Sequence, residues 1–272
     1  IGAVALLEKY HADVVLYDSS DKLTKEDLEA KLPGESKAVC IAGELPEEVE
    51  LSIQAAVLSP GVPTDIPLVN RMRDRGVQIL GEIELGFLAE QGRVIAITGT
   101  NGKTTTTTLT GEIMKAHFGA EKTFVVGNIG NPYTLEVTKT SKDSVTVGEI
   151  SSFQLETIHT FHPVVSAILN ITPDHLNRHH TMEAYVAAKE AVASQQTKAD
   201  ICVLNYDNDY TRDFAGRCPA TPVLFSSHQE LENGYFLRGD KIIKSVNGEE
   251  HELMDIHKDM NLVGLCNVEN VM

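Results

Sequence analysis

The sequence lacks any apolar run that approaches the roughly 18 residues needed to cross a lipid bilayer. It has only four cysteines, widely spaced and without a CxxC pair, which argues against a zinc site and against a disulfide framework. Its amphipathic start, IGAVALLEKY, lacks the basic residues and the small-residue cleavage site of a secretory signal. We therefore predict a cytoplasmic protein without membrane insertion.

Basic side chains are scarce. The sequence has 23 Lys and Arg against 39 Asp and Glu, which gives a formal charge of −16. This charge repels nucleic-acid phosphates, and no basic cluster offsets it, so we predict no nucleic-acid partner. Anionic small molecules would have to be bound by helix N-termini, single lysines and metal ions.

The length of 272 residues and the hydrophobic content of 42% fit one large domain or two ordinary ones. Apolar runs alternate with helical patterns along 14–80, and the alternation resumes from 93. This predicts the α/β class with parallel sheets. We place a boundary where a helical segment at 84–92 ends in glycine. The prediction is a Rossmann-like parallel-sheet domain at 1–90 and a second α/β domain at 91–272.

The expected elements follow from these patterns. Strands are predicted at 14–18, 38–42, 55–61, 77–80, 93–99, 122–128, 144–150, 164–170, 199–205 and 221–227. Helices are predicted at 103–118 and 182–196. Alternating residues at 234–253, broken by Arg238-Gly239-Asp240 and by Asn247-Gly248, predict a small β-hairpin region. Because such α/β domains usually open with a strand and a glycine turn, the helical start indicates that a first strand is missing.

A glycine-containing loop joins the strand expected at 93–99 to the helix expected at 103–118. It consists of Gly99, Thr100, Asn101, Gly102, Lys103, Thr104 and Thr105. Glycines let backbone N–H groups converge on phosphate oxygens, the helix N-terminus adds positive potential, and Lys103 and Thr104 suit phosphate and Mg²⁺. We predict a cradle for the phosphates of ATP. The alternative is a glycine-containing turn before a threonine-rich helix.

The loop departs from the common P-loop pattern GxxxxGK[ST], whose first glycine would fall at Ile97. The run TGTNGKTT instead resembles the variant of the Mur ligases and of the related folylpolyglutamate synthases. The run GEISSFQLE at 148–156 resembles the Mur ligases that add D-glutamate. Residues 1–90 resemble their UDP-binding domain, which favours a Mur ligase over a folylpolyglutamate synthase.

Metal-binding residues are expected next to the loop. Glu149 ends a predicted strand, where a carboxylate suits the Mg²⁺ of a nucleotide; the alternative is a surface carboxylate. The resemblance implies a second Mg²⁺ on His175 and on Lys189, with Lys189 carrying a carbamate formed from CO₂. Taken alone, a histidine after a strand or a lysine on a helix is more often structural or solvated. His179 and His180 have no matching role and are expected at the surface.

The resemblance assigns further residues to ATP and to the substrate. Residues 128–130 resemble a loop that lines the phosphate region, and 262–270 resemble a segment whose asparagines approach adenine and ribose. The implied contacts are Asn267 and Asn270 with ATP, and Asp18, Ser59, Pro60, Gly61, Asn128 and Ser151 with the substrate. Cys266 stands where the family usually has histidine, and Ser20 where it usually has arginine. Turns and helix caps are the alternative roles.

The resemblance also implies a reaction. The carboxylate of UDP-N-acetylmuramoyl-L-alanine would attack the γ-phosphate of ATP, and the D-glutamate amine would attack the acyl phosphate. Lys103 and the loop amides would stabilise the transferring phosphoryl group, while Thr104 and Glu149 would hold the first Mg²⁺. A lysine with a pKa near 10.4 is protonated at neutral pH, so a carbamate on Lys189 requires burial and nearby metal charge.

Family members continue into a third domain that binds the incoming amino acid. The resemblance therefore implies that these 272 residues are incomplete at the C-terminus and do not form the amide bond alone. We expect a monomer. The alternative of another class is a nucleotide-binding module without ligase activity, which would ignore UDP-N-acetylmuramoyl-L-alanine.

Overall fold

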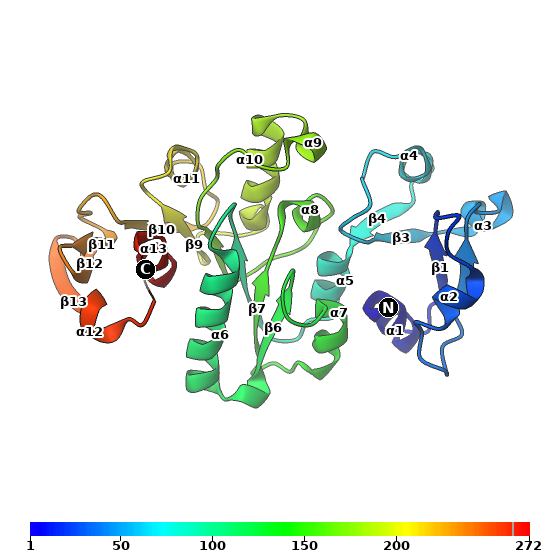
Figure 1. Ribbon diagram of the computed structural model, residues 1–272, viewed down its shortest axis with the longest axis horizontal. Helices are drawn as coiled ribbons and strands as arrows, with labels where there is room; N and C mark the ends of the chain where they lie inside the picture. The colour runs from blue at the N-terminus through cyan, green and yellow to red at the C-terminus, as the bar shows by residue number, and fades with distance from the viewer. Residues whose placement is uncertain (263) are drawn as a thin grey trace.

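The computed structural model describes residues 1–262 and 264–272, so Val263 of the 262–270 segment lies outside the described residues. Figure 1 shows an elongated arrangement with the first four strands at one end and β11 to β13 at the other. The long helix α6 (Lys103–Phe118) lies over the middle. The α/β class predicted from the sequence is confirmed.

The first part of the chain forms two separate pairs of parallel strands. β1 (Val15–Asp18) pairs with β2 (Val39–Ala42), and β3 (Ala55–Leu58) pairs with β4 (Gln78–Gly81). Each predicted strand is present. In the described part of the chain no ladder joins the two pairs, so one continuous Rossmann-like sheet does not form.

Short helices pack against the two strand pairs. The helices of this part are α1 (Gly2–Lys9), α2 (Lys25–Glu29), α3 (Glu47–Ser52), α4 (Pro67–Asp74) and α5 (Glu82–Leu88). Val69 and Met72 of α4 pack with Ile79 of β4 in a cluster separate from the larger core. The helix predicted at 84–92 is α5, which ends at Leu88 and does not reach the glycine.

A nine-stranded sheet forms the rest of the molecule, in the order β13-β12-β11-β10-β9-β8-β5-β7-β6. Its strands are β5 (Arg93–Thr98), β6 (Thr123–Gly127), β7 (Val145–Glu149), β8 (Val165–Ile168), β9 (Ile201–Asn205), β10 (Thr221–Ser226), β11 (Gly234–Arg238), β12 (Lys241–Val246) and β13 (Glu249–Asp255). Neighbours from β6 to β11 run parallel. β11, β12 and β13 are antiparallel, which confirms the predicted hairpin turns.

Both faces of the central strands are covered. On β5, Val94 and Ala96 enter one hydrophobic cluster, while Ile97 enters a second one against which Met114 and Phe118 of α6 pack. Successive side chains on a strand point to opposite faces, so this alternation buries both sides. Because these strands run parallel, their carboxyl ends meet at one edge of the sheet, where ligands bind in open α/β folds.

The helices around the sheet are short except for α6, whose bounds match the prediction. The others are α7 (Tyr133–Glu136), α8 (Ser152–Leu155), α9 (Leu176–His179), α10 (Met182–Glu190), α11 (Asp209–Ala215), α12 (Ile256–Asp259) and α13 (Leu265–Val271). The helix predicted at 182–196 is α10 followed by a 3-10 turn, Ala191–Ala193. No helix in the described ranges combines the length and the apolar character needed to cross a membrane.

Candidate nucleotide and metal site

The loop between β5 and α6 is held in place by Asn170, which follows β8. The Thr100 backbone N–H donates to the Asn170 carbonyl over 2.9 Å, and the Asn101 N–H donates to its side-chain oxygen over 2.8 Å. The Asn170 amide in turn donates to the Asn101 carbonyl over 3.1 Å. The loop conformation is thus fixed by a residue to which the sequence analysis gave no role.

Gly102 is required at its position for two reasons. Its φ of +86° is a conformation that L side chains rarely adopt, and an added Cβ would lie 2.2 Å from Oδ1 of Asn270. Gly99 is also tight, since a Cβ there would lie 3.1 Å from the Cβ of Leu169. The backbone therefore approaches neighbouring segments closely on both sides of the loop.

Lys103 begins α6 and folds back over the loop. Its Nζ donates to the carbonyls of Gly99 and Thr100, at 3.0 Å each. The ammonium group lies at the helix N-terminus, where the backbone N–H groups add positive potential. Thr105 lies in the first turn of the same helix. This arrangement concentrates positive charge and donors where a phosphate would bind.

Glu149 is the best-anchored carboxylate of the site. Its side chain is 1% exposed, accepts a hydrogen bond from Thr104 Oγ1 at 2.8 Å and accepts another from Asn128 Nδ2 at 2.7 Å. Octahedral Mg²⁺ binds oxygen at about 2.0–2.1 Å, so adjacent ligand oxygens lie about 2.9 Å apart. The spacing between the Thr104 and Glu149 oxygens fits two adjacent ligands of one such ion.

Lys189 is buried under the loop. It is 2% exposed, and its Nζ donates to the Gly99 carbonyl over 2.7 Å, the same carbonyl that Lys103 reaches. Burial, followed by the charge of Lys103, lowers the pKa of Lys189 to about 7, while the carboxylate of Asp174 opposes this shift. Burial thus favours the neutral amine.

His175 lies apart from this cluster of anchored residues. It occupies the N-cap position of α9 with a φ of +52°, and its side chain is 49% exposed. Its ring centroid lies 4.9 Å from that of Phe153, and Nε2 lies 3.5 Å from Oδ2 of Asp174. In this structure Lys189 Nζ contacts the Gly99 carbonyl, and the His175 ring packs on Phe153.

Comparison with known proteins decides the family. Residues 97–272 match the profile of the Mur ligase middle domain. The chain belongs to the Mur ligase family. It is 54% identical over 271 residues to a UDP-N-acetylmuramoylalanine–D-glutamate ligase from Lachnospira eligens and 51% identical over 272 residues to one from Lachnoclostridium phytofermentans. Both alignments cover 100% of this chain and 59% of the relative, so the chain spans about three-fifths of their length.

Solved Mur ligase structures share the fold at low sequence identity. A UDP-N-acetylmuramate:L-alanyl-gamma-D-glutamyl-meso-diaminopimelate ligase from Neisseria meningitides matches with a TM-score of 0.56 at 14% identity, covering 99% of this chain and 86% of that one. The UDP-N-acetylmuramate-alanine ligase of Thermotoga maritima matches with a TM-score of 0.52 at 18% identity, covering 99% and 59%.

His179 of this Mur ligase is buried, so its predicted surface position is wrong. It is 6% exposed, and its Nε2 lies 2.9 Å from Ser152 Oγ. The ring stacks on Phe153 at 5.4 Å and lies 5.2 Å from the ring of Tyr185. The reason is packing: the turn of α9 places the ring between α8 and α10. His180 is exposed, as expected.

Helix α13 brings the two predicted nucleotide-contacting asparagines to the start of α6. Thr106 Oγ1 lies 3.3 Å from the Asn270 carbonyl oxygen and 3.4 Å from its Oδ1. The Asn270 amide donates to Asn267 Oδ1 over 3.3 Å. Cys266, on the same helix, is exposed. Asn270 thus adjoins the loop, and its contact with ATP stays a prediction.

Four of the residues predicted to contact the substrate belong to the first 90 residues. Ser59 and Pro60 line a small cleft between the end of β3 and α8, opposite Phe153. Gly61 is exposed. Asp18 ends β1, and its Oδ1 accepts a hydrogen bond from the Ser20 backbone N–H at 2.9 Å. This turn contact is the alternative that the sequence analysis gave to substrate binding by Asp18.

Ser151 has a clear structural role in addition to its predicted one. It caps α8 in a reciprocal capping box: its hydroxyl oxygen accepts the Gln154 N–H at 3.3 Å, and Gln154 Oε1 accepts the Ser151 N–H at 2.9 Å. The spacing of Ser and Gln within GEISSFQLE is the sequence signal for this cap. Ser151 thereby fixes the turn that follows Glu149.

Proposed function

We propose that the chain binds Mg²⁺ and ATP at the carboxyl edge of the central sheet, within an amide ligase that joins D-glutamate to UDP-N-acetylmuramoyl-L-alanine. The observation that carries the nucleotide part is the glycine loop with Lys103 folded over it and Thr104 hydrogen-bonded to buried Glu149. Similarity to the two D-glutamate ligases supports the substrate part.

Each residue of the loop has a task in this proposal. The backbone N–H groups of 99–105 and the Lys103 ammonium contact the phosphates, which requires Lys103 to leave the two carbonyls that it now contacts. Thr104 and Glu149 would hold Mg²⁺, which when bound neutralises phosphate charge. Asn267 and Asn270 approach adenine and ribose from α13.

The chemistry requires activation because a carboxylate is a poor electrophile. The alanyl carboxylate oxygen bonds to the γ-phosphorus as the bond to ADP breaks, and the amine then displaces phosphate from the acyl phosphate. Lys103 and the loop amides stabilise the charge on the transferring phosphoryl oxygens. Asn128 and Ser151 contact the substrate near Glu149, while Asp18, Ser59, Pro60 and Gly61 contact its nucleotide part.

We further propose that Lys189 carries a carbamate. A neutral amine attacks CO₂ and loses a proton, and its burial with a pKa lowered to about 7 supports this reaction at neutral pH. The carbamate would hold a second Mg²⁺ together with His175. The family resemblance supports this pairing.

The same proposal includes the organisation of the chain. Two domains, 1–90 for the UDP-substrate and 91–272 for ATP, would act in a monomeric cytoplasmic enzyme. The separate strand pairs of the first part and the continuous sheet of the second support this division. That these residues do not form the amide bond alone stays a prediction.

Thermal stabilisation tests the proposal because a ligand selective for the native state raises the melting temperature. UDP-N-acetylmuramoyl-L-alanine should stabilise the chain, and UDP-N-acetylglucosamine, which lacks the alanyl carboxylate, should stabilise it less. Stabilisation by ATP but by neither UDP compound would favour a nucleotide-binding module. Stabilisation by a folate would favour a folylpolyglutamate synthase.

A further inference from the structure

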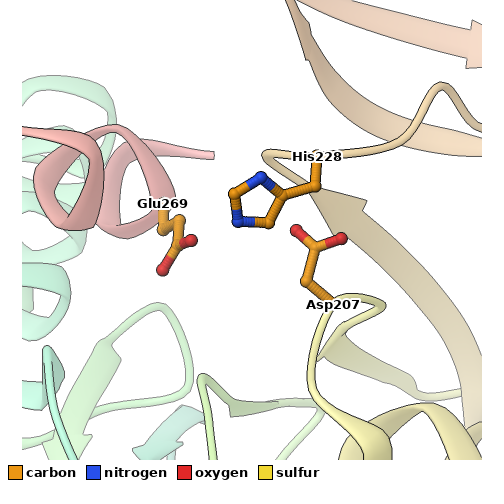
Figure 2. Close-up of side chains that lie close together, drawn as sticks. All are labelled: Asp207, His228 and Glu269. Carbon is orange, nitrogen blue, oxygen red and sulfur yellow. The ribbon is translucent and has the colours of Figure 1, made fainter.

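A second group of metal-ligating side chains lies outside the nucleotide site. Asp207 follows β9, His228 follows β10, and Glu269 belongs to α13 (Figure 2). One ligand atom from each lies within 4.8 Å of the others. Figure 2 shows the His228 ring between the two carboxylates. None of these residues has a task in the proposed reaction.

The two carboxylates share one hydroxyl, and within residues 1–262 and 264–272 neither forms an ion pair with a Lys or Arg side chain. Ser227 Oγ lies 2.7 Å from Glu269 Oε1 and 3.3 Å from Asp207 Oδ2. A hydroxyl has one proton, so it can donate fully to only one of them. A cation between the carboxylates would relieve their repulsion.

Neighbouring donors already orient the carboxylate of Asp207. Its Oδ1 accepts a hydrogen bond from Ser226 Oγ at 2.6 Å, and its Oδ2 accepts the Ser227 backbone N–H at 2.7 Å. Ser226 and Ser227 are buried, and His228 directly follows them. Such outer hydrogen bonds hold the ligands of metal sites in position.

We propose that Asp207, His228 and Glu269 bind one divalent transition-metal ion, of which Zn²⁺ is the representative, with water completing the coordination. One imidazole with two carboxylates binds Zn²⁺ more tightly than Mg²⁺ or Ca²⁺, whose ligands are mostly oxygen atoms. His228 is exposed, so its ring can turn to reach bonding distance. The ion would link α13 to the segments that follow β9 and β10.

Direct titration tests this site without ATP or substrate. The chelator-treated chain is titrated with Zn²⁺ in a calorimeter, with excess Mg²⁺ present to occupy oxygen-ligand sites. The variants are His228→Ala and Glu269→Gln, and the control is His251→Ala, an exposed histidine on β13. Melting curves without metal verify that each variant is folded.

The wild type and His251→Ala should each bind one equivalent of Zn²⁺. His228→Ala and Glu269→Gln should bind this equivalent at least about tenfold more weakly, because even the loss of a hydrogen-bond partner of a metal ligand lowers metal affinity by about 10–100-fold. Co²⁺ should give visible absorption bands that His228→Ala lacks. Equal Zn²⁺ affinity in the wild type and both cluster variants would overturn the proposal. Because no nucleotide is involved, this failure would leave the proposed ligase function untouched.

Discussion

The candidate site has a nucleotide half, formed by the glycine loop and the residues around it, and a substrate half in the first 90 residues. The two halves differ in which parts of the chain hold their side chains in place. In the nucleotide half, partners come from distant parts of the chain: Asn170 fixes the loop, and Glu149 anchors Thr104. In the first 90 residues, Asp18 contacts its own turn and Ser59 lines an open cleft. The nucleotide half is therefore the more tightly packed, and substitutions there should change stability or ligand binding strongly, whereas the substrate half should tolerate them.

The largest effect is expected at Lys189, where Lys189→Met removes a buried amine. Its folded pKa of about 7 lies below the ordinary value of 10.5. Below pH 7 the Lys189 amine is charged in both the folded and the unfolded state, so folding bears the full free-energy cost of burying that charge. Between about pH 7 and pH 10.5 the unfolded state binds more protons than the folded state, so the stability of the wild type rises with pH. The free energy of unfolding of Lys189→Met should exceed that of the wild type by up to about 5 kcal/mol below pH 7, and this difference should disappear toward pH 10.

Chemical denaturation from pH 6 to pH 10 in CO₂-free buffer measures this difference. Lys115→Met is the control, because Lys115 is a partly exposed lysine of α6 that pairs with Glu112, and it should show no comparable trend. A stability difference between Lys189→Met and wild type that does not change with pH would mean that the Lys189 pKa is ordinary.

A smaller effect is expected at Gly102. Gly102→Ala forces a side chain into a positive φ and against Asn270, which should cost about 3 kcal/mol. Gly43→Ala is a matched control, since Gly43 has a φ of +85° with no atom within 4 Å of an added Cβ. The difference between the two unfolding free energies isolates the close approach to α13. Equal losses of unfolding free energy in the two variants would show that the contact with Asn270 of α13 does not constrain Gly102.

His179 and His180 allow a buried and an exposed histidine to be compared at adjacent positions. His179→Ala removes a ring packed between Phe153 and Tyr185 and should cost about 2 kcal/mol. His180→Ala, next to it but exposed, should change stability by no more than about 0.5 kcal/mol. Urea titration distinguishes the two variants, and equal costs would contradict the packing described for His179.

The smallest effect on stability is expected in the substrate half. Asp18→Ala removes one turn contact and should change the unfolding free energy by less than about 0.5 kcal/mol. It should leave ATP binding unchanged while reducing the thermal shift caused by UDP-N-acetylmuramoyl-L-alanine. An undiminished shift would remove Asp18 from the substrate site.

The sequence predicted the central sheet well because its strands are continuous apolar runs and its phosphate loop is contiguous. The bounds of α6 and the turns at Gly239 and Gly248 followed from local patterns for the same reason. Burial of His179 was missed, because it depends on how α9 packs between α8 and α10. Local patterns predicted the strands of the first part but not their separation into two pairs, which depends on packing.

The residues that hold the site together were the hardest to predict. Asn170 acts on the loop across adjacent strands, and the cluster of Asp207, His228 and Glu269 forms only when β9, β10 and α13 pack together. No spacing rule within one segment describes such contacts. By contrast, the Ser151 capping box is local, and although the sequence analysis did not predict it, the Ser-x-x-Gln spacing is a signal for it.

Nucleotide binding by the Lys103 variant tests the central claim most directly. The melting temperatures of wild type, Lys103→Ala and the control Lys115→Ala are compared with and without saturating Mg²⁺ and ATP. At a ligand concentration 100 times the dissociation constant, wild type and control should gain about 2.7 kcal/mol, whereas Lys103→Ala should gain almost nothing while folding normally. A nucleotide affinity of Lys103→Ala equal to that of wild type would contradict the assignment of the loop as the ATP site.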